Sequence, residues 1–259
     1  MGRGAPNERL WEKALIVPSW VAPASVRAFT TTRLGGFSQG PYQGFNLALH
    51  VGDDPLQVLQ NRKLLAVEAA LPAEPFWLDQ VHGHCVLDHP AEGCLPSIAP
   101  KADASVAFEP AQVCAVFTAD CLPVLLCDSA GTCVAAVHAG WRGLCAGIIE
   151  AAVERIKIDP THLMAWLGPA ISVKHYEVGA DVFEAFKPDE RAQGFVKTGT
   201  DKWHCDLYVL ARKRLKDLGL RAQAISGGDY CTYADPRFYS YRRSGLTGRM
   251  VTLIWLEAS

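Results

Sequence analysis

Apolar residues along the chain follow two spacings, one typical of buried strands and one typical of helices. Short runs of strand-forming residues predict strands at 26–31, 76–81, 104–108, 113–117, 121–127, 133–137, 163–167, 222–225 and 250–256. Apolar residues three and four positions apart predict helices at 55–71, 142–156, 178–186 and 207–218. Because strands cluster in runs and strict β–helix–β alternation is missing, we expect an α+β fold with a mixed or antiparallel sheet and flanking helices.

The helix predicted after Asp54 has a clear start and a proposed buried face. Asp54 is a favoured N-cap residue, and Pro55 is well tolerated in the first turn. The apolar residues expected to form its buried stripe are Leu56, Leu59, Leu64, Val67 and Leu71.

A hairpin signal in the middle of the chain brings two reactive side chains together. The apolar runs 121–127 and 133–137 flank a polar break at 128–132. If paired residue numbers sum to about 259, Cys121 lies opposite His138, and opposed Cβ atoms are roughly 4.5–5.5 Å apart. A slip of one residue would place the two side chains on opposite faces of the sheet.

Length and composition limit the class of protein. A chain of 259 residues suffices for one large domain, and no linker-like tract divides it, so we expect a single domain over 1–259 with a loose N-terminus at 1–13. Lys and Arg total 25 against 27 Asp and Glu, which argues against a nucleic-acid partner. Nothing resembles a secretory signal or a bilayer span, which predicts a soluble, cytoplasmic protein without membrane contact. Nine irregularly spaced cysteines predict mostly free thiols.

Three residues at or next to the ends of predicted strands form a candidate metal site. They are His82, Cys121 and His138, and one thiolate with two imidazoles suits zinc. Three protein ligands with a fourth position open to water is the pattern of a catalytic zinc site. A structural zinc with a fourth ligand such as His84 or Cys85 is the alternative.

The same residues also fit a reaction without a metal. Cys121 can act as a nucleophile with His138 as its base, as in cysteine hydrolases. Asp120 adjoins Cys121 but points to the other face of a regular strand. A bend in the chain would let Asp120 orient a histidine or transfer protons.

Three arginines beside glycines or aromatic residues are candidates for binding phosphate. Arg142 follows Gly140 and Trp141, Arg33 precedes two glycines, and Arg242 follows a tyrosine. An ordinary exposed arginine is the alternative interpretation for each.

Several segments, taken together, resemble one protein family. They read TTRLGGFSQGPYQGFNLALHVGDD, QVHG, TADCLPVLLCD, AVHAGWRG, AWLGPAI, CTY, FYSYRR and TGRM, and they run in the family's order from about residue 30 to residue 256. They resemble the YfiH-like laccase-domain proteins, also called polyphenol oxidases or purine nucleoside phosphorylases. The resemblance implies the α+β fold grouped with CNF-type deamidating toxin domains that use a Cys–His pair. It also implies zinc bound by His82, Cys121 and His138.

The resemblance further implies a reaction. Purine nucleosides and phosphate would be the partners, with adenosine, inosine and methylthioadenosine split to base and ribose 1-phosphate, and adenosine also deaminated. One alternative is a Cys–His amidohydrolase that edits a peptidoglycan precursor. Another is a copper-dependent polyphenol oxidase, but the eight histidines include no HCH segment, which argues against a multicopper enzyme. The sequence predicts no particular oligomeric state.

Overall fold

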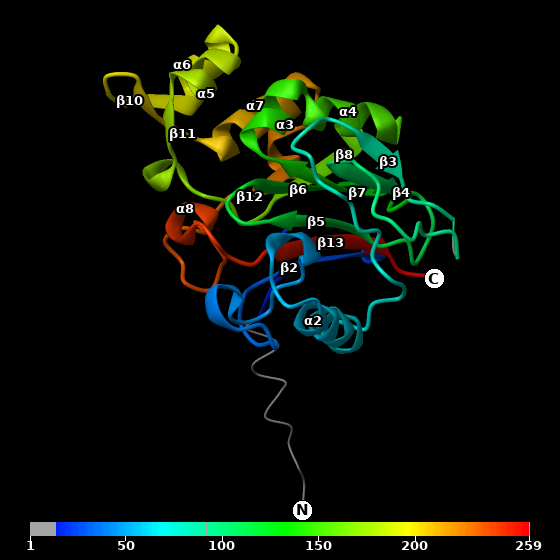
Figure 1. Ribbon diagram of the computed structural model, residues 1–259. Coiled ribbons are helices and arrows are strands. Elements are labelled where there is room, and N and C mark those ends of the chain that lie inside the picture. The colour runs from blue at the N-terminus through cyan, green and yellow to red at the C-terminus, as the bar shows by residue number, and fades with distance from the viewer. Residues whose placement is uncertain (1–13, 92, 259) are drawn as a thin grey trace, which may run out of the picture.

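Two β-sheets packed face to face form the centre of the computed structural model, which describes residues 14–91 and 93–258 (Figure 1). The mixed sheet has the order β12 (Ile225–Gly227), β8 (Leu163–Leu167), β6 (Leu122–Asp128), β7 (Val134–Ala139), β4 (Ala104–Ala107) and β3 (Val86–Asp88). The antiparallel sheet has the order β1 (Leu15–Ile16), β2 (Val26–Thr31), β13 (Met250–Leu256) and β5 (Cys114–Thr118). The predicted loose segment 1–13 lies outside the described residues.

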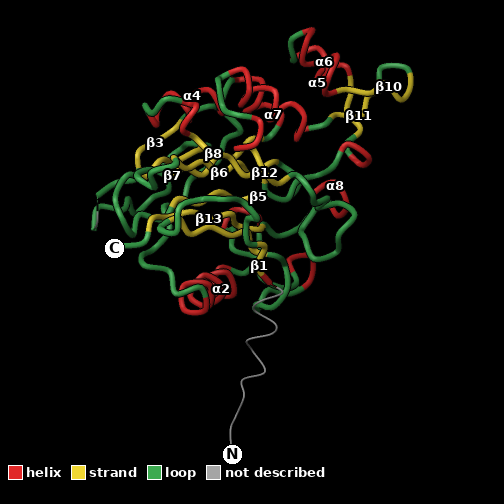
Figure 2. The backbone as a smooth tube through the Cα atoms, turned by 180° about the vertical axis from the view of Figure 1, so that it is seen from behind, coloured by secondary structure: helices red, strands yellow, loops and turns green. Residues whose placement is uncertain are grey.

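Helices cover the outer faces of both sheets, as Figures 1 and 2 show from opposite sides. The mixed sheet is covered by α3 (Trp141–Ala146), α4 (Ile148–Ile156) and α7 (Leu207–Asp217), whereas α2 (Pro55–Glu68) covers the antiparallel sheet. At one end lies a smaller sheet of β10 (Phe195–Gly199), β11 (Lys202–Cys205) and β9 (Glu177–Gly179), with α5 (Ala180–Ala185) and α6 (Pro188–Gly194). The last helix is α8 (Tyr241–Ser244). The predicted α+β class, with mixed and antiparallel sheets and flanking helices, is confirmed.

The strands of the mixed sheet are apolar on both faces because both faces are buried. Along β6, Leu122, Val124 and Leu126 pack under α4, whereas Leu125 and Cys127 pack against the antiparallel sheet. This two-residue alternation is the side-chain period of a strand. Asp120 and Cys121, which directly precede β6, are therefore attached to a fully packed element.

Several predicted elements have different limits in the structure. Residues 76–81 form no strand and make only isolated bridges. Residues 222–224 form a 3-10 turn before β12. The single helix expected at 142–156 is broken at Gly147, whose φ of 87° ends α3 and begins α4. Glycine adopts this left-handed conformation without the steric penalty that other residues meet.

Helix α2 begins as predicted, with the Asp54 side chain accepting a hydrogen bond from Leu56 N. Its predicted buried stripe is wrong at Leu56, Leu59 and Val67, which are exposed, whereas Leu64 and Leu71 pack partly against the core. Leu56 is 71% and Val67 68% exposed, whereas Asn61 and Leu65 are buried. The Asn61 amide accepts a hydrogen bond from Phe37 N and donates to backbone and side-chain oxygens of the glycine-rich loop before the helix. A polar anchor, not the apolar stripe, thus sets the side of the helix that is buried.

All nine cysteines are free thiols, and four of them are buried. None of the helices in the described part of the chain has the length and apolar character needed to cross a bilayer.

Candidate active site

The predicted hairpin forms, but its register differs from the predicted one by two residues. Pro123 lies opposite His138 and Leu122 opposite Ala139, so paired numbers sum to 261 rather than about 259. A shift of two residues keeps every side chain on its face of the sheet, because side chains alternate with period two. Cys121 is therefore a diagonal neighbour of His138 on the same face.

The turn of the hairpin explains the shift. The Asp128 carboxylate accepts hydrogen bonds from the backbone N–H groups of Ala130, Thr132 and Cys133 at 2.7–3.2 Å. These bonds hold Cys133 in the turn, so the second strand begins at Val134 rather than at the predicted Cys133.

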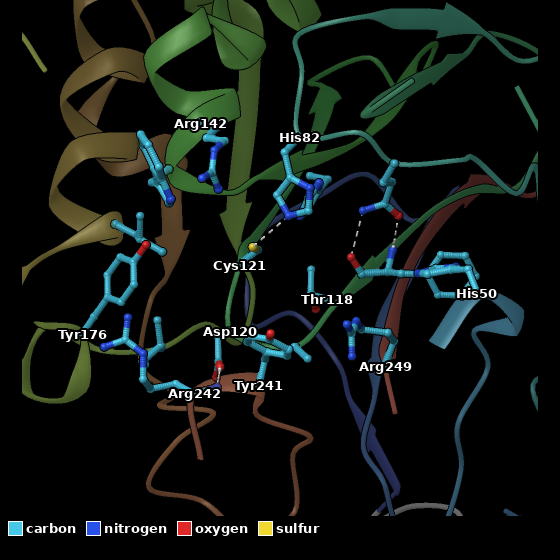
Figure 3. A pocket seen from close by; sticks show the side chains of 17 residues that line it. His50, His82, Thr118, Asp120, Cys121, Arg142, Tyr176, Tyr241, Arg242 and Arg249 are labelled. Carbon is cyan, nitrogen blue, oxygen red and sulfur yellow. Dashed lines mark hydrogen bonds between the residues drawn. The ribbon is translucent and has the colours of Figure 1, made fainter. Parts of the chain in front are cut away.

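His82, Cys121 and His138 converge at one wall of a cavity of about 430 Å³. One ligand atom from each residue lies within 4.8 Å of the other two. The Cys121 Sγ is 4.0 Å from His82 Nε2, and the two imidazole rings meet edge to face with centroids 4.8 Å apart. Figure 3 shows Cys121 and His82 facing each other in this cavity.

A buried carboxylate, Asp103, holds both histidines in place. Its Oδ1 is 2.8 Å from His138 Nδ1, and it accepts hydrogen bonds from the backbone N–H groups of His82 and Gly83 at 2.9 and 2.7 Å. Because Nδ1 of His138 is engaged, Nε2 is the nitrogen left to face the cavity. Asp103 thus orients His138 through a bond to its ring, and His82 through bonds to the backbone of the loop that carries it.

Sequence reasoning did not single out Asp103, although a signal was present. Asp103 stands immediately before β4, between Ala102 and Ala104, and it is fully buried. A carboxylate within an apolar strand run needs partners, because buried charges are rarely left unpaired. Ala104 pairs with Val137, which places Asp103 beside His138, but this register is not readable from the sequence.

The backbone is strained at two positions next to the ligand atoms. His82 has a φ of 60° and Asp120 a φ of 91°, both in the left-handed region that non-glycine residues rarely occupy. Such residues cost about 1–3 kcal/mol each and persist only where surrounding contacts hold them. At His82 the bonds to Asp103 provide that hold.

The pKa values of Cys121 and His138 are shifted in opposite directions by each other and by their neighbours. Although burial opposes ionisation of the thiol, the positive charge and hydrogen bonds of His138, with those of His82, lower the pKa of Cys121. Burial likewise opposes protonation of His138, but Cys121 and Asp103 raise the pKa of its imidazole. In the absence of a metal, a thiolate–imidazolium pair is therefore favoured.

This donor set fits a zinc ion. Zn–S and Zn–N bonds of about 2.3 and 2.0 Å at tetrahedral angles place donor atoms about 3.5 Å apart, slightly closer than the atoms are here. Among the described residues, no fourth His, Cys, Asp or Glu joins the group, and His84 and Cys85 are exposed outside it. The arrangement therefore matches a three-ligand site with an open position, not a closed structural site.

Of the two roles predicted for Asp120, orienting a histidine finds no matching contact, and proton transfer stays a prediction. Its carboxylate accepts hydrogen bonds from Thr232 Oγ1 at 2.6 Å and from Arg242 N at 2.7 Å, and none from a histidine. Because both oxygens are used, Asp120 anchors the segment that carries Thr232 and the first turn of α8, which carries Arg242. Orientation of the histidine falls to Asp103 instead.

Three arginines line the cavity, and two of them were predicted. Arg142 contacts the ring of Trp141 but makes no hydrogen bond or ion pair within the described residues. Arg242 donates to Glu177 O at 2.7 Å, and Arg249, which sequence reasoning missed, donates to the backbone oxygens of residues 247 and 248. Figure 3 shows all three around Cys121.

Arg33, the other predicted phosphate ligand, does not line this cavity. Its guanidinium lies over the ring of Tyr239, 5.0 Å from the centroid, and donates to Gln43 O. The structure therefore does not bring Arg33 to the candidate metal group, which consists of His82, Cys121 and His138.

The remaining lining includes residues without a sequence signal of their own. His50, Tyr176 and Tyr241 contribute rings, and the fully buried Thr118 contributes a hydroxyl with no protein partner among the described residues. Polar groups placed in a partly apolar cavity are typical of small-molecule sites.

Replacing Gly140 with alanine is expected to weaken metal binding without changing any ligand. A Cβ there would lie 2.9 Å from Cys121 Sγ and 3.4 Å from His82 Cδ2, so the sulfur would have to move. We expect zinc affinity to fall about tenfold or more, as for other changes around metal ligands. Competition with a chromophoric chelator measures it.

Gly83→Ala is the matched control for Gly140→Ala, because a Cβ at Gly83 would make only ordinary contacts at 3.5 Å or more. Equal zinc affinities in the two variants would contradict the steric argument.

The chain is similar to known proteins along most of its length. Residues 27–257 match a family model described as multi-copper polyphenol oxidoreductase laccase. The chain is 51% identical over 245 residues to "Purine nucleoside phosphorylase YfiH" of Shigella flexneri, covering 93% of this chain and 98% of that protein. It is 50% identical over 245 residues to the protein of the same name from Escherichia coli K12, with the same coverage.

A solved structure shows the same fold. Neisseria meningitidis protein NMB0706 superposes with a TM-score of 0.88 at 45% identity, over 95% of this chain and 100% of that one.

Proposed function

This chain belongs to the laccase-domain (YfiH-like) family, and we propose that it is a zinc-dependent purine nucleoside phosphorylase. The proposal rests on one observation. A group of one thiol and two imidazoles lies in the same cavity as three arginines. Asp120 is the one carboxylate that lines the cavity among the described residues, and both of its oxygens are already bonded. Three guanidinium groups that form no ion pair with a described carboxylate, beside a possible metal site, suit phosphate together with a neutral nucleoside.

Each part of the cavity has a task in this reaction. In phosphorolysis, a phosphate oxygen forms a bond to the anomeric carbon while the bond from that carbon to the purine breaks. Arg142 has an uncommitted guanidinium and binds the phosphate, while Arg242 and Arg249 add positive charge at fixed positions. Tyr176 and Tyr241 offer rings against which the purine can pack.

His82, Cys121 and His138 hold the metal in this proposal. A zinc ion there supplies a Lewis acid without redox chemistry. Phosphorolysis needs no electron transfer, which favours zinc, although one thiolate and two imidazoles also suit a single copper ion. The described residues hold one such group, whereas the description of the family model speaks of several coppers.

The test is to incubate the purified protein with phosphate and with adenosine, inosine or methylthioadenosine in turn. We expect free base and the matching sugar 1-phosphate in equal amounts, which is ribose 1-phosphate from adenosine or inosine and methylthioribose 1-phosphate from methylthioadenosine. Both products should be lost after complete chelation and recovered on adding zinc. Inosine formed from adenosine would show the deamination that belongs to the same proposal. Turnover that persists after metal removal, or base released without the matching sugar 1-phosphate, would contradict the proposal.

A second candidate function is supported by the order Cys121–His138–Asp103. A thiol of lowered pKa, an imidazole and a buried carboxylate form the nucleophile–base–carboxylate arrangement of cysteine hydrolases. The protein would then be an amidohydrolase for which a cell-wall peptide precursor is the test substrate. In this case chelation should increase amide hydrolysis, because the thiolate is released from the metal.

Replacing Arg142 with alanine is expected to raise the KM for phosphate about 10- to 100-fold. Hydrogen bonds to charged groups contribute about 1.5–3 kcal/mol, and this guanidinium has no other partner to release. Initial rates at varied phosphate measure the effect. Arg33→Ala, outside the cavity, is the control, and an equal effect of the two variants would argue against a phosphate site at Arg142.

A further inference from the structure

A second thiol–imidazole pair lies outside the cavity, at Cys231 and His175. The Cys231 Sγ is 3.4 Å from His175 Nδ1 and accepts a hydrogen bond from Ser172 N at 3.4 Å. The Ser172 hydroxyl lies 3.5 Å from the same ring nitrogen, and the ring stacks on Tyr233 with centroids 4.7 Å apart. None of these four residues lines the cavity or belongs to the metal group.

The surroundings of Cys231 favour a reactive thiolate. Although partial burial opposes ionisation, hydrogen bonds from Ser172, Ala234 and Tyr233 lower the pKa of the thiol. Cys231 and His175 are both partly exposed, so a small reagent can reach the sulfur. By contrast, burial raises the pKa of Cys114 and Cys205. Thiolate character combined with access is what makes a cysteine reactive.

We propose that Cys231 is a peroxide-sensitive thiol, which His175 and the backbone of Ser172 hold as a thiolate. The sulfur attacks one oxygen of a hydroperoxide, so an S–O bond forms and the O–O bond breaks. The sulfur is oxidised to a sulfenic acid and the peroxide is reduced. The departing hydroxide takes a proton from solvent and leaves as water.

The position of Cys231 links it to the cavity wall. The neighbouring Thr232 bonds both Ala170 O and the Asp120 carboxylate, and Asp120 adjoins the ligand Cys121. On the other side, Ser172 adjoins Ile171, which lines the cavity. An added oxygen on Sγ would stand where Ser172 N and the His175 ring now meet the sulfur. Oxidation therefore displaces residues that support the cavity.

The experiment uses zinc-loaded full-length protein, in which the metal protects Cys121. The protein is exposed to hydrogen peroxide with dimedone, and each cysteine is followed by mass spectrometry of its peptide. We expect Cys231 to be labelled about tenfold faster than the exposed Cys85 and Cys94, because a thiolate reacts where a thiol does not. His175→Gln should slow the labelling of Cys231 several-fold, because the ring nitrogen that lies 3.4 Å from the sulfur is lost.

Labelling of Cys231 no faster than that of Cys85 and Cys94 in the unmodified protein would overturn the proposal, whatever the variant does. A second readout is nucleoside turnover, which peroxide should reduce in the wild type, reversibly with a thiol reductant, but not in Cys231→Ser. Inhibition that persists in Cys231→Ser would overturn the link to the cavity. The labelling result does not depend on turnover, so failure of the phosphorylase proposal would be recognised separately.

Discussion

Replacing Cys121 with serine is expected to lower zinc affinity about 100-fold or more and to abolish phosphorolysis. Structural zinc sites with four ligands bind with about 10–16 kcal/mol, or about 3 kcal/mol per ligand, and 1.4 kcal/mol is a factor of ten. Serine preserves the shape of the side chain but supplies no soft thiolate. Chelator competition and the nucleoside assay measure the two losses in parallel.

The fold of the Cys121→Ser variant should survive, because Cys121 is only partly buried and the core does not depend on its sulfur. In the presence of chelator, its free energy of unfolding should match that of the wild type within about 1 kcal/mol. The matched control is Cys94→Ser, an exposed thiol outside the metal group. If Cys121→Ser bound zinc as tightly as the wild type does, the Cys121 thiolate could not be a zinc ligand.

Replacing Asp103 with asparagine is expected to reduce both metal affinity and stability. The carboxylate faces the Nδ1 of His138 and the backbone N–H groups of Val81, His82 and Gly83. An amide has only one oxygen, so its NH2 group must point at another donor. We expect zinc affinity and turnover to fall about 10- to 100-fold. Unfolding free energy should fall by about 1–3 kcal/mol, the cost of an unsatisfied buried group.

Urea unfolding with chelator present, combined with zinc titration, separates the two effects of Asp103→Asn. Burial raises the pKa of Asp103, but its bonds to His138, Gly83 and His82 outweigh burial and lower it. Its stabilisation is therefore complete above the ordinary pKa of an aspartate, about 3.9, and is lost as pH falls through the lowered value. The exposed Asp88→Asn is the control. Equal losses in the two variants would contradict a special role for Asp103.

Local sequence signals predicted the elements well where one physical cause sets them. The limits of β2, β8 and β13 agree with the predicted 26–31, 163–167 and 250–256, because each strand is a short run rich in apolar and β-branched residues. The convergence of Cys121 with His138 was also predictable. Side chains alternate between the two faces of a strand with period two, so an error of two residues in the register leaves Cys121 and His138 on the same face.

Features set by tertiary contacts were not predictable. Asp103 reaches His138 because β4 pairs with β7, and neither residue carries a sign of this pairing. The buried side of α2 is set by the bonds of Asn61 to a distant loop. Arg249 joins the cavity because β13 pairs with β5 across more than half of the chain. In each case, a partner remote in sequence determines the outcome.

X-ray absorption at the zinc edge of the zinc-loaded protein would show which atoms bind the metal. We expect one zinc per chain, with one sulfur at about 2.3 Å and two imidazole nitrogens at about 2.0 Å, and with the sulfur missing from the shell in Cys121→Ser. A shell without sulfur in the wild type, or one unchanged in the variant, would show that this cavity does not hold the metal as described.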